Sequence, residues 1–293
     1  MEELEAFRQR LNDHFPHLTK SERHIASFLL AYYDQAAYLP AAELAQRLDV
    51  SEATVVRFAK AIGCDGFPEL RRTLESVFRA KITPASRLQR KLADLHDGQG
   101  HILTKIIDME IEYLTEAEHT VSTEDFDRAL QLILDGKRVF VFAVGASHFL
   151  AELVEFRLRR FGVPVVSLTE TGRDLAEKLI LLQADDVVLA TGFHRVSNEL
   201  VALVTHARSL GCRIVFLTDT LGPTFRGKVD VILSARRGPV STFHSLTVPM
   251  AILNAFILAV AMARSEESLA SLDLLQSLRA VYGLDALVKS PNS

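Results

Sequence analysis

Five short apolar runs occupy the second half of the chain and limit its fold more than any other feature. They lie at residues 139–142, 163–168, 187–189, 214–217 and 229–233. Each of the first four is followed by small or polar residues and then by a helical pattern. Continuous apolar runs that alternate with helices indicate parallel strands covered on both faces. The sequence therefore predicts an open parallel sheet in a three-layer α/β/α domain.

Residues 1–120 differ, because their apolar side chains follow helical spacing and form no strand-like runs. Thr19 and Glu22 have the spacing of a capping box, which predicts a helix from there to about Tyr32. Pro40 suits the first position of another helix, anchored by Leu44 and Leu48. The fold class is therefore α/β, with an all-α N-terminal domain ahead of the parallel sheet.

Asp49, Val50 and Ser51 separate two short helical patterns. A tight turn between crossing helices needs a residue that tolerates positive φ, which Asp49 can do at some cost. Ser51 is a favoured N-cap for the second helix. That helix would direct inward Val55, Ile62 and either Phe58 or Ala59, and outward Glu52, Ala53, Val56, Arg57 and Lys60. The spacing indicates a helix-turn-helix, whose second helix enters the major groove of DNA.

Charge is distributed unevenly along the chain. The whole chain has 33 basic and 37 acidic residues, for a formal charge of −4, so it is no general polycation. Residues 51–91 nevertheless contain nine Lys or Arg and four Asp or Glu. This local excess fits a DNA-binding surface, although basic residues on three packed amphipathic helices would give the same count by being solvated.

Several blocks occur in a fixed order within residues 1–78: LTKSERHIA at 18–26, LA at 44–45, VSEATVVRF at 50–58, and Gly63 with GFPEL at 66–70. In these blocks the chain resembles the N-terminal domain of RpiR-family bacterial transcription regulators. The resemblance implies that Ser51, Thr54 and Arg57 lie at the DNA surface.

The predicted DNA-binding residues are Ser51, Glu52, Ala53, Thr54, Arg57 and Lys60. Arg57 suits paired hydrogen bonds to guanine O6 and N7. Ser51, Thr54 and Lys60 suit phosphate contacts, which orient the domain without reading sequence. For Ser51 and Thr54, helix capping alone is the alternative.

Polar residues follow the predicted strands at the edge where open parallel sheets bind ligands. Ser147 follows the first strand beside a helix start, where free N–H groups attract anions. An ordinary strand-to-helix turn is the alternative reading. Arg195 could bind a phosphate or carboxylate, or it could be an exposed loop residue. The full set of candidate effector-binding residues is Ser147, Thr191, His194, Arg195, Ser197, Ser241 and Thr242.

Residues 126–275 resemble a sugar isomerase (SIS) domain, which RpiR regulators carry after the DNA-binding domain. The likeness rests on residues 139–147, 186–189, 217–219 and 235–245. It implies a phosphosugar site formed by hydroxyl groups, here Ser147, Ser197 and, less securely, Ser241 and Thr242.

The loop after the third strand departs from the SIS pattern. One branch of these regulators shows Ser-Phe-x-Arg-Tyr-Ser there, but Gly192 replaces the leading Ser and Val196 replaces Tyr. Thr191 is the candidate to supply the missing hydroxyl from one position earlier.

No catalytic residues, metal or cofactor are predicted. Cys64 and Cys212 lack metal-ligand spacing, and chance placement explains His148, His194 and His244 better than convergence on a metal. An isomerase would need a general base such as Glu170 or His194, and no defensible carboxylate–histidine pair occurs. A SIS-fold isomerase, or a regulator whose SIS domain only dimerises, remains the alternative.

The sequence thus predicts a transcription regulator with four parts: a DNA-binding domain at 1–78, a helical linker at 79–125, a SIS domain at 126–275 and a C-terminal helix and tail at 276–293. Its expected partners are a double-stranded DNA operator and a phosphosugar or related effector. We expect a homodimer or tetramer, because two DNA half-sites need two recognition helices. We expect it in the cytoplasm and without a membrane span, because the longest apolar stretch, residues 248–263, is too short to cross a bilayer. Ile102, Ile106, Met109 and Leu114 predict a linker helix that packs on the SIS domain.

Overall fold

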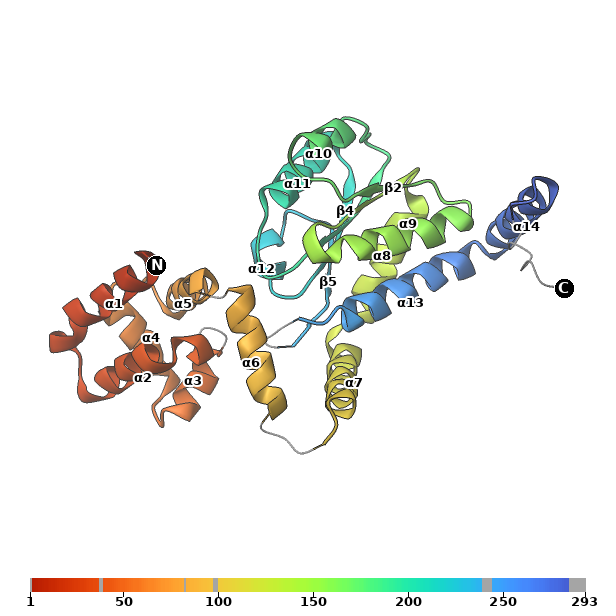
Figure 1. Ribbon diagram of the computed structural model, residues 1–293. Coiled ribbons are helices and arrows are strands. Elements are labelled where there is room, and N and C mark those ends of the chain that lie inside the picture. The colour runs from red at the N-terminus through yellow and green to blue at the C-terminus, as the bar shows by residue number, and fades with distance from the viewer. Residues whose placement is uncertain (1, 37–38, 82, 97–99, 239–243, 285–293) are drawn as a thin grey trace. The chain divides into compact units, whose positions relative to one another are not determined.

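The structure is a computed structural model, and it describes residues 2–36, 39–81, 83–96, 100–238 and 244–284. These residues form two compact units, one within residues 1–98 and the other from residue 99 onward. Figure 1 labels the helices and strands of both units. Each unit is described here by itself.

The first unit is entirely helical. Its elements are α1 (Glu2–His14), the 3-10 helix η1 (Phe15–His17), α2 (Lys20–Ala36), α3 (Ala41–Arg47), α4 (Glu52–Ala61), α5 (Phe67–Lys81) and α6 (Pro84–His96). The predicted capping box is present, since Thr19 N–H donates to Glu22 and Glu22 N–H donates to the Thr19 hydroxyl. The helix that it starts runs to Ala36, one turn beyond the predicted end. The fully buried core includes Leu11, Ile25, Leu29, Leu44, Phe58, Ile62, Leu70 and Leu74.

The second unit contains a five-stranded parallel sheet, which confirms the predicted fold class. Its elements are α7 (Ile102–Thr120), α8 (Thr123–Asp135), β1 (Val139–Phe142), η2 (Gly145–Ser147), α9 (His148–Arg160), β2 (Val165–Leu168), α10 (Gly172–Leu179), β3 (Val187–Gly192), α11 (Asn198–Leu210), β4 (Arg213–Thr218), α12 (Gly222–Phe225), β5 (Val231–Ser234), α13 (Thr247–Ala263) and α14 (Ser265–Val281). The strand order is β2-β1-β3-β4-β5. Strand β2 lies on one side of β1, and β3, β4 and β5 follow on the other side. The strand order therefore reverses between β1 and β3, which places the topological switch point of the sheet there.

Alternate residues of each strand enter two separate cores. Val139 and Val141 of β1 pack in one cluster with residues of α8, α9 and α13. Phe140 and Phe142 pack in the other with residues of α10 and α11. A strand buried on both faces needs apolar residues at every position, which explains the continuous runs in the sequence.

Helix α7 departs from the prediction. Ile102, Ile111 and Leu114 are exposed, while Ile106 and Met109 are only half-buried. The helix packs on α13 through its C-terminal half, where Ala117 is buried in the core. The expected packing is therefore wrong for Ile102 and Leu114, whose side chains are exposed, and α7 contacts the core through Tyr113 and Ala117 instead.

Two of the predicted domain boundaries fall inside helices. Residue 78 lies within α5 and residue 275 lies within α14. Among the described residues, no single helix has both the length and the apolar content to cross a membrane. Helices α13 and α14 have that length and apolar content only when taken together, and the chain bends by 98° between them.

Candidate functional site

The turn between α3 and α4 has the predicted geometry. Asp49 adopts a φ of 51°, the left-handed conformation that a tight helix-to-helix turn requires. Ser51 is the N-cap of α4, and its hydroxyl accepts a hydrogen bond from Thr54 N–H at 3.1 Å. The cap satisfies one of the free N–H groups at the helix start. This short connection fixes the direction of α4 relative to α3.

Helix α4 has one buried side and one exposed side. Val55, Phe58 and Ala59 are buried. The sequence left open whether Phe58 or Ala59 faces inward, and both side chains do. The opposite side carries Glu52, Ala53, Arg57 and Lys60, all of them exposed, while Thr54 is half-buried. These outward residues belong to the predicted DNA-binding set.

A chain of hydrogen bonds runs along the first turn and a half of α4. The Ser51 and Thr54 hydroxyls lie 2.8 Å apart, and Arg57 Nη2 donates to the Thr54 hydroxyl at 3.0 Å. Ser51 therefore caps the helix, and the Thr54 hydroxyl links the Ser51 side chain to Arg57. The cap explains both hydroxyls by itself, so their contact with DNA stays a prediction.

In the second unit, the candidate ligand residues lie where β1 and β3 end. Ser147 is half-buried at the N-cap of α9, and its side chain forms no capping bond. The next residue, His148, contacts the Gly145 carbonyl through Nδ1 at 2.8 Å. The Ser147 hydroxyl is thus not used to hold the helix start together.

Two other predicted hydroxyls have structural partners. Thr191 is only 2% exposed and donates to the Phe142 carbonyl at 3.1 Å, which ties β3 to β1. Ser197 caps α11 by accepting from Leu200 N–H at 3.1 Å. Arg195 is exposed. Ser241 and Thr242 lie outside the described residues.

Thr191 does not replace the serine missing at position 192, because its hydroxyl is buried and bonded inside the sheet. Packing explains why Gly192 stands there. A Cβ at this position would lie 2.8 Å from Leu200 Cδ2 and 3.0 Å from the Phe216 ring. Real Cβ atoms do not approach so closely, so a serine here requires the Leu200 and Phe216 side chains to shift.

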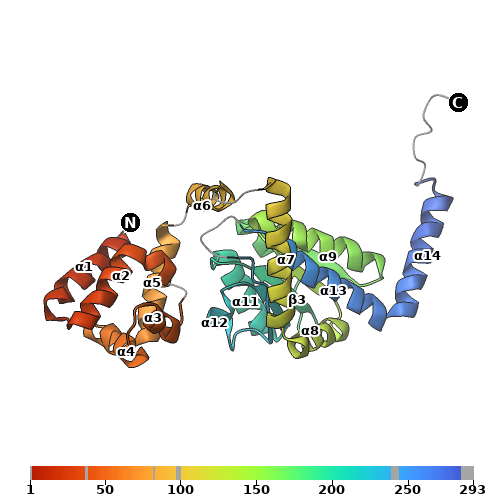
Figure 2. The same ribbon diagram turned by 90° about the horizontal axis from the view of Figure 1, so that it is seen from below.

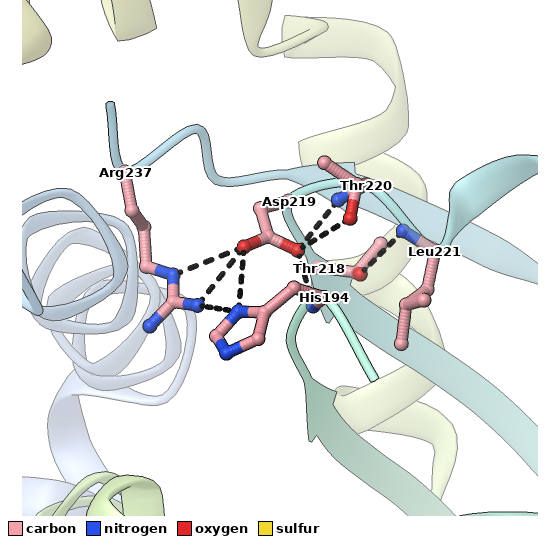
Figure 3. A network of polar contacts seen from close by, with 6 residues as sticks. All are labelled: His194, Thr218, Asp219, Thr220, Leu221 and Arg237. Atoms are coloured by element: carbon pink, nitrogen blue, oxygen red, sulfur yellow. Dashed lines mark hydrogen bonds and ion pairs between the residues drawn. The ribbon is translucent and has the colours of Figure 1, made fainter. Parts of the chain in front are cut away.

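A buried ion pair joins the ends of β4 and β5 (Figure 3). Arg237 Nη2 lies 2.9 Å from Asp219 Oδ2, and the two side chains are 5% and 6% exposed. The other carboxylate oxygen accepts the backbone N–H groups of His194 at 2.8 Å and Thr220 at 2.6 Å. The Arg237 guanidinium also lies 3.9 Å above the centre of the Phe193 ring. Asp219 therefore holds together the loops that follow β3, β4 and β5.

Each charge of this pair stabilises the ionised form of the other residue. Burial alone would raise the pKa of Asp219, but hydrogen bonds from His194 and the charge of Arg237 outweigh it and hold that pKa far below its usual range. Burial lowers the pKa of Arg237, and Asp219 offsets part of that effect. Each charge is compensated mainly by the other, as a buried ion pair requires.

His194 is placed by the same network. Its backbone has a φ of 40°, and its Nδ1 lies 2.7 Å from Arg237 Nη2. The same Nδ1 lies 3.5 Å from Asp219 Oδ2, so the ring contacts both charges of the buried pair. The ring stacks on His244 at 4.3 Å between centroids. His194 therefore joins the loop after β3 to the Arg237–Asp219 pair.

The three histidines do not assemble a metal site. His148 takes part in a different contact, with Gly145 and the Phe149 ring. No cluster of three or more His, Cys, Asp or Glu with metal-binding geometry occurs among the described residues.

Sequence reasoning missed Arg237 and gave Asp219 no role. The signal was the position of each residue directly after a strand, Asp219 after β4 and Arg236 and Arg237 after β5. The partners are 18 residues apart, and no local spacing joins them.

A cavity of about 500 Å³ adjoins Asp219 on the β5 side of the sheet. Thr218, Gly222, Arg226 and Ser234 also line it. None of the five predicted effector-binding residues that the structure describes lines it, so among these residues the cavity and the predicted ligand edge are linked through the Asp219 network.

The fold and the two sites define a class of protein, a helix-turn-helix domain joined to a SIS-type α/β domain. Residues 6–81 match the family described as "Helix-turn-helix domain, rpiR family", and residues 132–259 match the SIS domain. The chain belongs to the RpiR family.

Curated relatives share both parts of the chain. The regulator HexR of Pseudomonas aeruginosa is 26% identical over 266 residues, which cover 89% of this chain and 90% of that protein. HexR of Escherichia coli is 28% identical over 218 residues, 74% of each chain. The "Bifunctional protein glk" of Paraburkholderia xenovorans is 25% identical over 206 residues, but this chain spans only 32% of its length.

Solved structures support the fold. The Vibrio vulnificus NanR protein complexed with ManNAc-6P aligns over 95% of this chain and 99% of its own, with a TM-score of 0.61 and 18% identity. The sugar isomerase domain of an RpiR transcription factor from Sphaerobacter thermophilus aligns over 61% of this chain and 99% of its own, with a TM-score of 0.57 and 23% identity.

Proposed function

We propose that the protein is a DNA-binding transcription regulator whose SIS domain binds a phosphorylated sugar or related metabolite and thereby changes operator affinity. The observation that carries the proposal is the exposed side of α4, where Arg57 is oriented by capping hydroxyls at the start of a helix-turn-helix second helix. Helices of this kind place their N-terminal residues against base edges in the major groove. Ser51, Glu52, Ala53, Thr54, Arg57 and Lys60 form the proposed DNA surface.

The effector binds, in this proposal, at the carboxyl ends of β1 and β3. Ser147, His194, Arg195 and Ser197 supply donors there, and Thr191 positions β3 beneath them. Ser241 and Thr242 complete the set from the segment before α13. The NanR structure contains ManNAc-6P, which supports a phosphorylated sugar as the ligand class.

A regulator of this type needs two copies, because one recognition helix contacts few base pairs and two half-sites multiply the specificity. We therefore propose a homodimer, or a tetramer built from dimers, acting in the cytoplasm. Residues 1–78 bind DNA, residues 79–125 connect, and residues 126–275 bind the effector and pair the subunits, followed by the C-terminal segment at 276–293.

We propose no catalytic activity. Glu170, the best-placed carboxylate for a general base, pairs with Lys178 at 2.6 Å. Burial raises its pKa, but the hydrogen bond and charge of Lys178 and two backbone hydrogen bonds together outweigh that effect, so the pKa is lowered overall. A carboxylate held in its ionised form in an ion pair is a poor proton acceptor near neutral pH.

Fluorescence anisotropy with the promoter DNA of the neighbouring genes tests the proposal. Addition of sugar phosphates, screened first by thermal shift, is expected to change the DNA dissociation constant for at least one compound. Ser147→Ala should reduce this response and leave DNA affinity unchanged in the absence of effector. The matched control is Ser209→Ala on α11, where the hydroxyl bonds only to the His206 carbonyl of the same helix.

Each competing reading has its own outcome in these assays. If no metabolite shifts the melting temperature, the SIS domain serves pairing alone. If a sugar phosphate is turned over and Glu170→Ala abolishes the turnover, the protein is an isomerase.

A further inference from the structure

The residues that follow β5 contact two different parts of the second unit. Arg237 is buried at the ligand edge of the sheet, where its guanidinium lies 2.9 Å from Asp219 and 2.7 Å from Nδ1 of His194 (Figure 3). Arg236, the residue before it, is exposed and pairs with Glu116 of α7 at 2.6 Å. Two adjacent arginines therefore join the ligand edge to α7.

The next residue, Gly238, lies directly against the same helix. Its φ is 80°, and a Cβ at this position would overlap the ring of Tyr113 on α7. Tyr113 in turn packs against the core of the second unit. Because the space between them does not hold even a methyl group, a displacement of Gly238 toward α7 must also displace the Tyr113 ring.

One side of α7 carries Tyr113, Glu116 and Ala117. They are three and four residues apart, the spacing that places side chains next to one another on a helix. Ala117 is buried in the core, and α7 packs on α13 (Figure 2). The side of α7 that holds the helix on the second unit is thus the side that residues 236–238 contact.

Helix α7 is also the part of the second unit that comes first in the chain. Helix α6 of the first unit ends at His96, and α7 begins at Ile102. The polypeptide that joins the helix-turn-helix to the ligand edge therefore passes through α7. A change in how α7 is held is for this reason a change at the start of the connection to the first unit.

We propose that residues 236–238, which we call the coupling segment, transmit a change at the ligand edge to α7. An effector that contacts the His194 side chain competes with the contact between that ring and Arg237. Closely packed side chains pass a displacement on rather than absorb it, so a shift of Arg237 alters the neighbouring contacts with α7. This inference deepens the proposed function and rests on it for the position of the effector beside His194.

The ion pair between Arg236 and Glu116 suits a contact that changes between two states. The two side chains are 60% and 41% exposed. Exposed ion pairs contribute little to the free energy of unfolding, so loss of this pair should leave the melting temperature almost unchanged. An effect of the pair on the local opening of α7 therefore reflects coupling and not general stability.

Hydrogen–deuterium exchange of the full chain tests the coupling without an effector or DNA. His194→Ala changes the ligand edge, and Glu116→Gln removes the ion pair on α7. Each single variant should speed exchange of the amides at residues 113–120 by about threefold, and independent effects would then multiply to about ninefold. Coupled sites should give a double variant that exchanges no more than about fourfold faster than the wild type, because His194→Ala has already weakened the pair.

Glu118→Gln is the matched control, because Glu118 is an exposed glutamate on the same helix. Its effect and that of His194→Ala should multiply. His194→Gln is the second variant of the ligand edge, and it should give the same result as His194→Ala. Circular dichroism checks that every variant is folded.

Two results would overturn the inference: effects of the His194 variants and Glu116→Gln that simply multiply, or His194 variants that leave exchange in α7 unchanged. The proposed function fails separately. A coupled exchange result, with no metabolite that changes operator affinity, refutes the proposed function and leaves the coupling segment in place. A metabolite that changes operator affinity in a chain whose exchange effects multiply refutes this inference alone.

Discussion

The guanidinium of Arg237 lies 2.9 Å from the carboxylate of Asp219, and both side chains are almost fully buried. The pair connects the loop after β5 to Asp219, the residue that directly follows β4, and through His194 to the loop after β3. The ligand edge of the sheet is thus held by charge as well as by the strands.

Arg237→Met should lower the free energy of unfolding by about 3–5 kcal/mol, because it leaves the Asp219 carboxylate buried without its counterion. The double variant Arg237→Met with Asp219→Asn should recover part of this loss, since neither charge remains. Urea denaturation of the two single variants and the double variant measures the coupling. Purely additive losses would mean that the pair does not act as a unit.

Asp219 should also make stability depend on pH. Its pKa is lowered in the folded state, so its contribution is present above the ordinary aspartate pKa of about 3.9 and is lost as pH falls toward the folded value. The difference in melting temperature between the wild type and Asp219→Asn should be constant from about pH 7 to pH 5 and shrink below about pH 4. Glu177→Gln, at an exposed site on α10, is the control. A difference that grows in acid would contradict the assigned direction.

Arg57 and Lys60 should have different effects on DNA binding. Arg57→Ala is expected to cost about 1–3 kcal/mol on the cognate site and to relax specificity at one base pair. Lys60→Ala should weaken cognate and random DNA alike and reduce the salt dependence by about one counterion. Anisotropy titrations at several salt concentrations separate the two roles. Equal losses for Arg57→Ala on both kinds of DNA would show that Arg57 reads no base.

Gly192→Ser should destabilise the second unit by about 1–3 kcal/mol, because the new Cβ meets Leu200 and Phe216 at 2.8 and 3.0 Å. Gly222→Ser is the matched control, since a Cβ there would meet Ile232 at an ordinary 3.5 Å. The control should stay within about 0.5 kcal/mol of the wild type. Thermal unfolding measures both variants, and equal melting temperatures would mean that Leu200 and Phe216 can move aside.

The parts of the fold that depend on local pattern could be predicted. The run at 139–142 forms β1, an interior strand of the sheet, because burial on both faces demands apolar residues at every position. Asp49 has the positive φ that the short turn requires, and Ser51 caps α4. In each case neighbouring residues carry the signal, and the chain has few alternatives.

Features that depend on distant partners could not be predicted. The Arg237 and Asp219 pair joins two loops, and no spacing rule links them. Thr191 looked like a ligand hydroxyl, but its partner is the Phe142 carbonyl on the adjacent strand. Apolar spacing on α7 and α13 indicated burial, but Ile102 of α7 and Leu258 of α13 are exposed, because the spacing does not show how much surface the rest of the chain offers.

The space around Gly192 also bears on how the ligand loop can evolve. A serine at this position requires the Leu200 and Phe216 side chains to shift. Leu200 lies in the first turn of α11, and Ser197, from the same loop as Gly192, caps that helix. The residue at position 192 is therefore coupled to the packing of Leu200 and Phe216. Within the lineage, the identity of residue 192 should covary with the volume of residues 200 and 216.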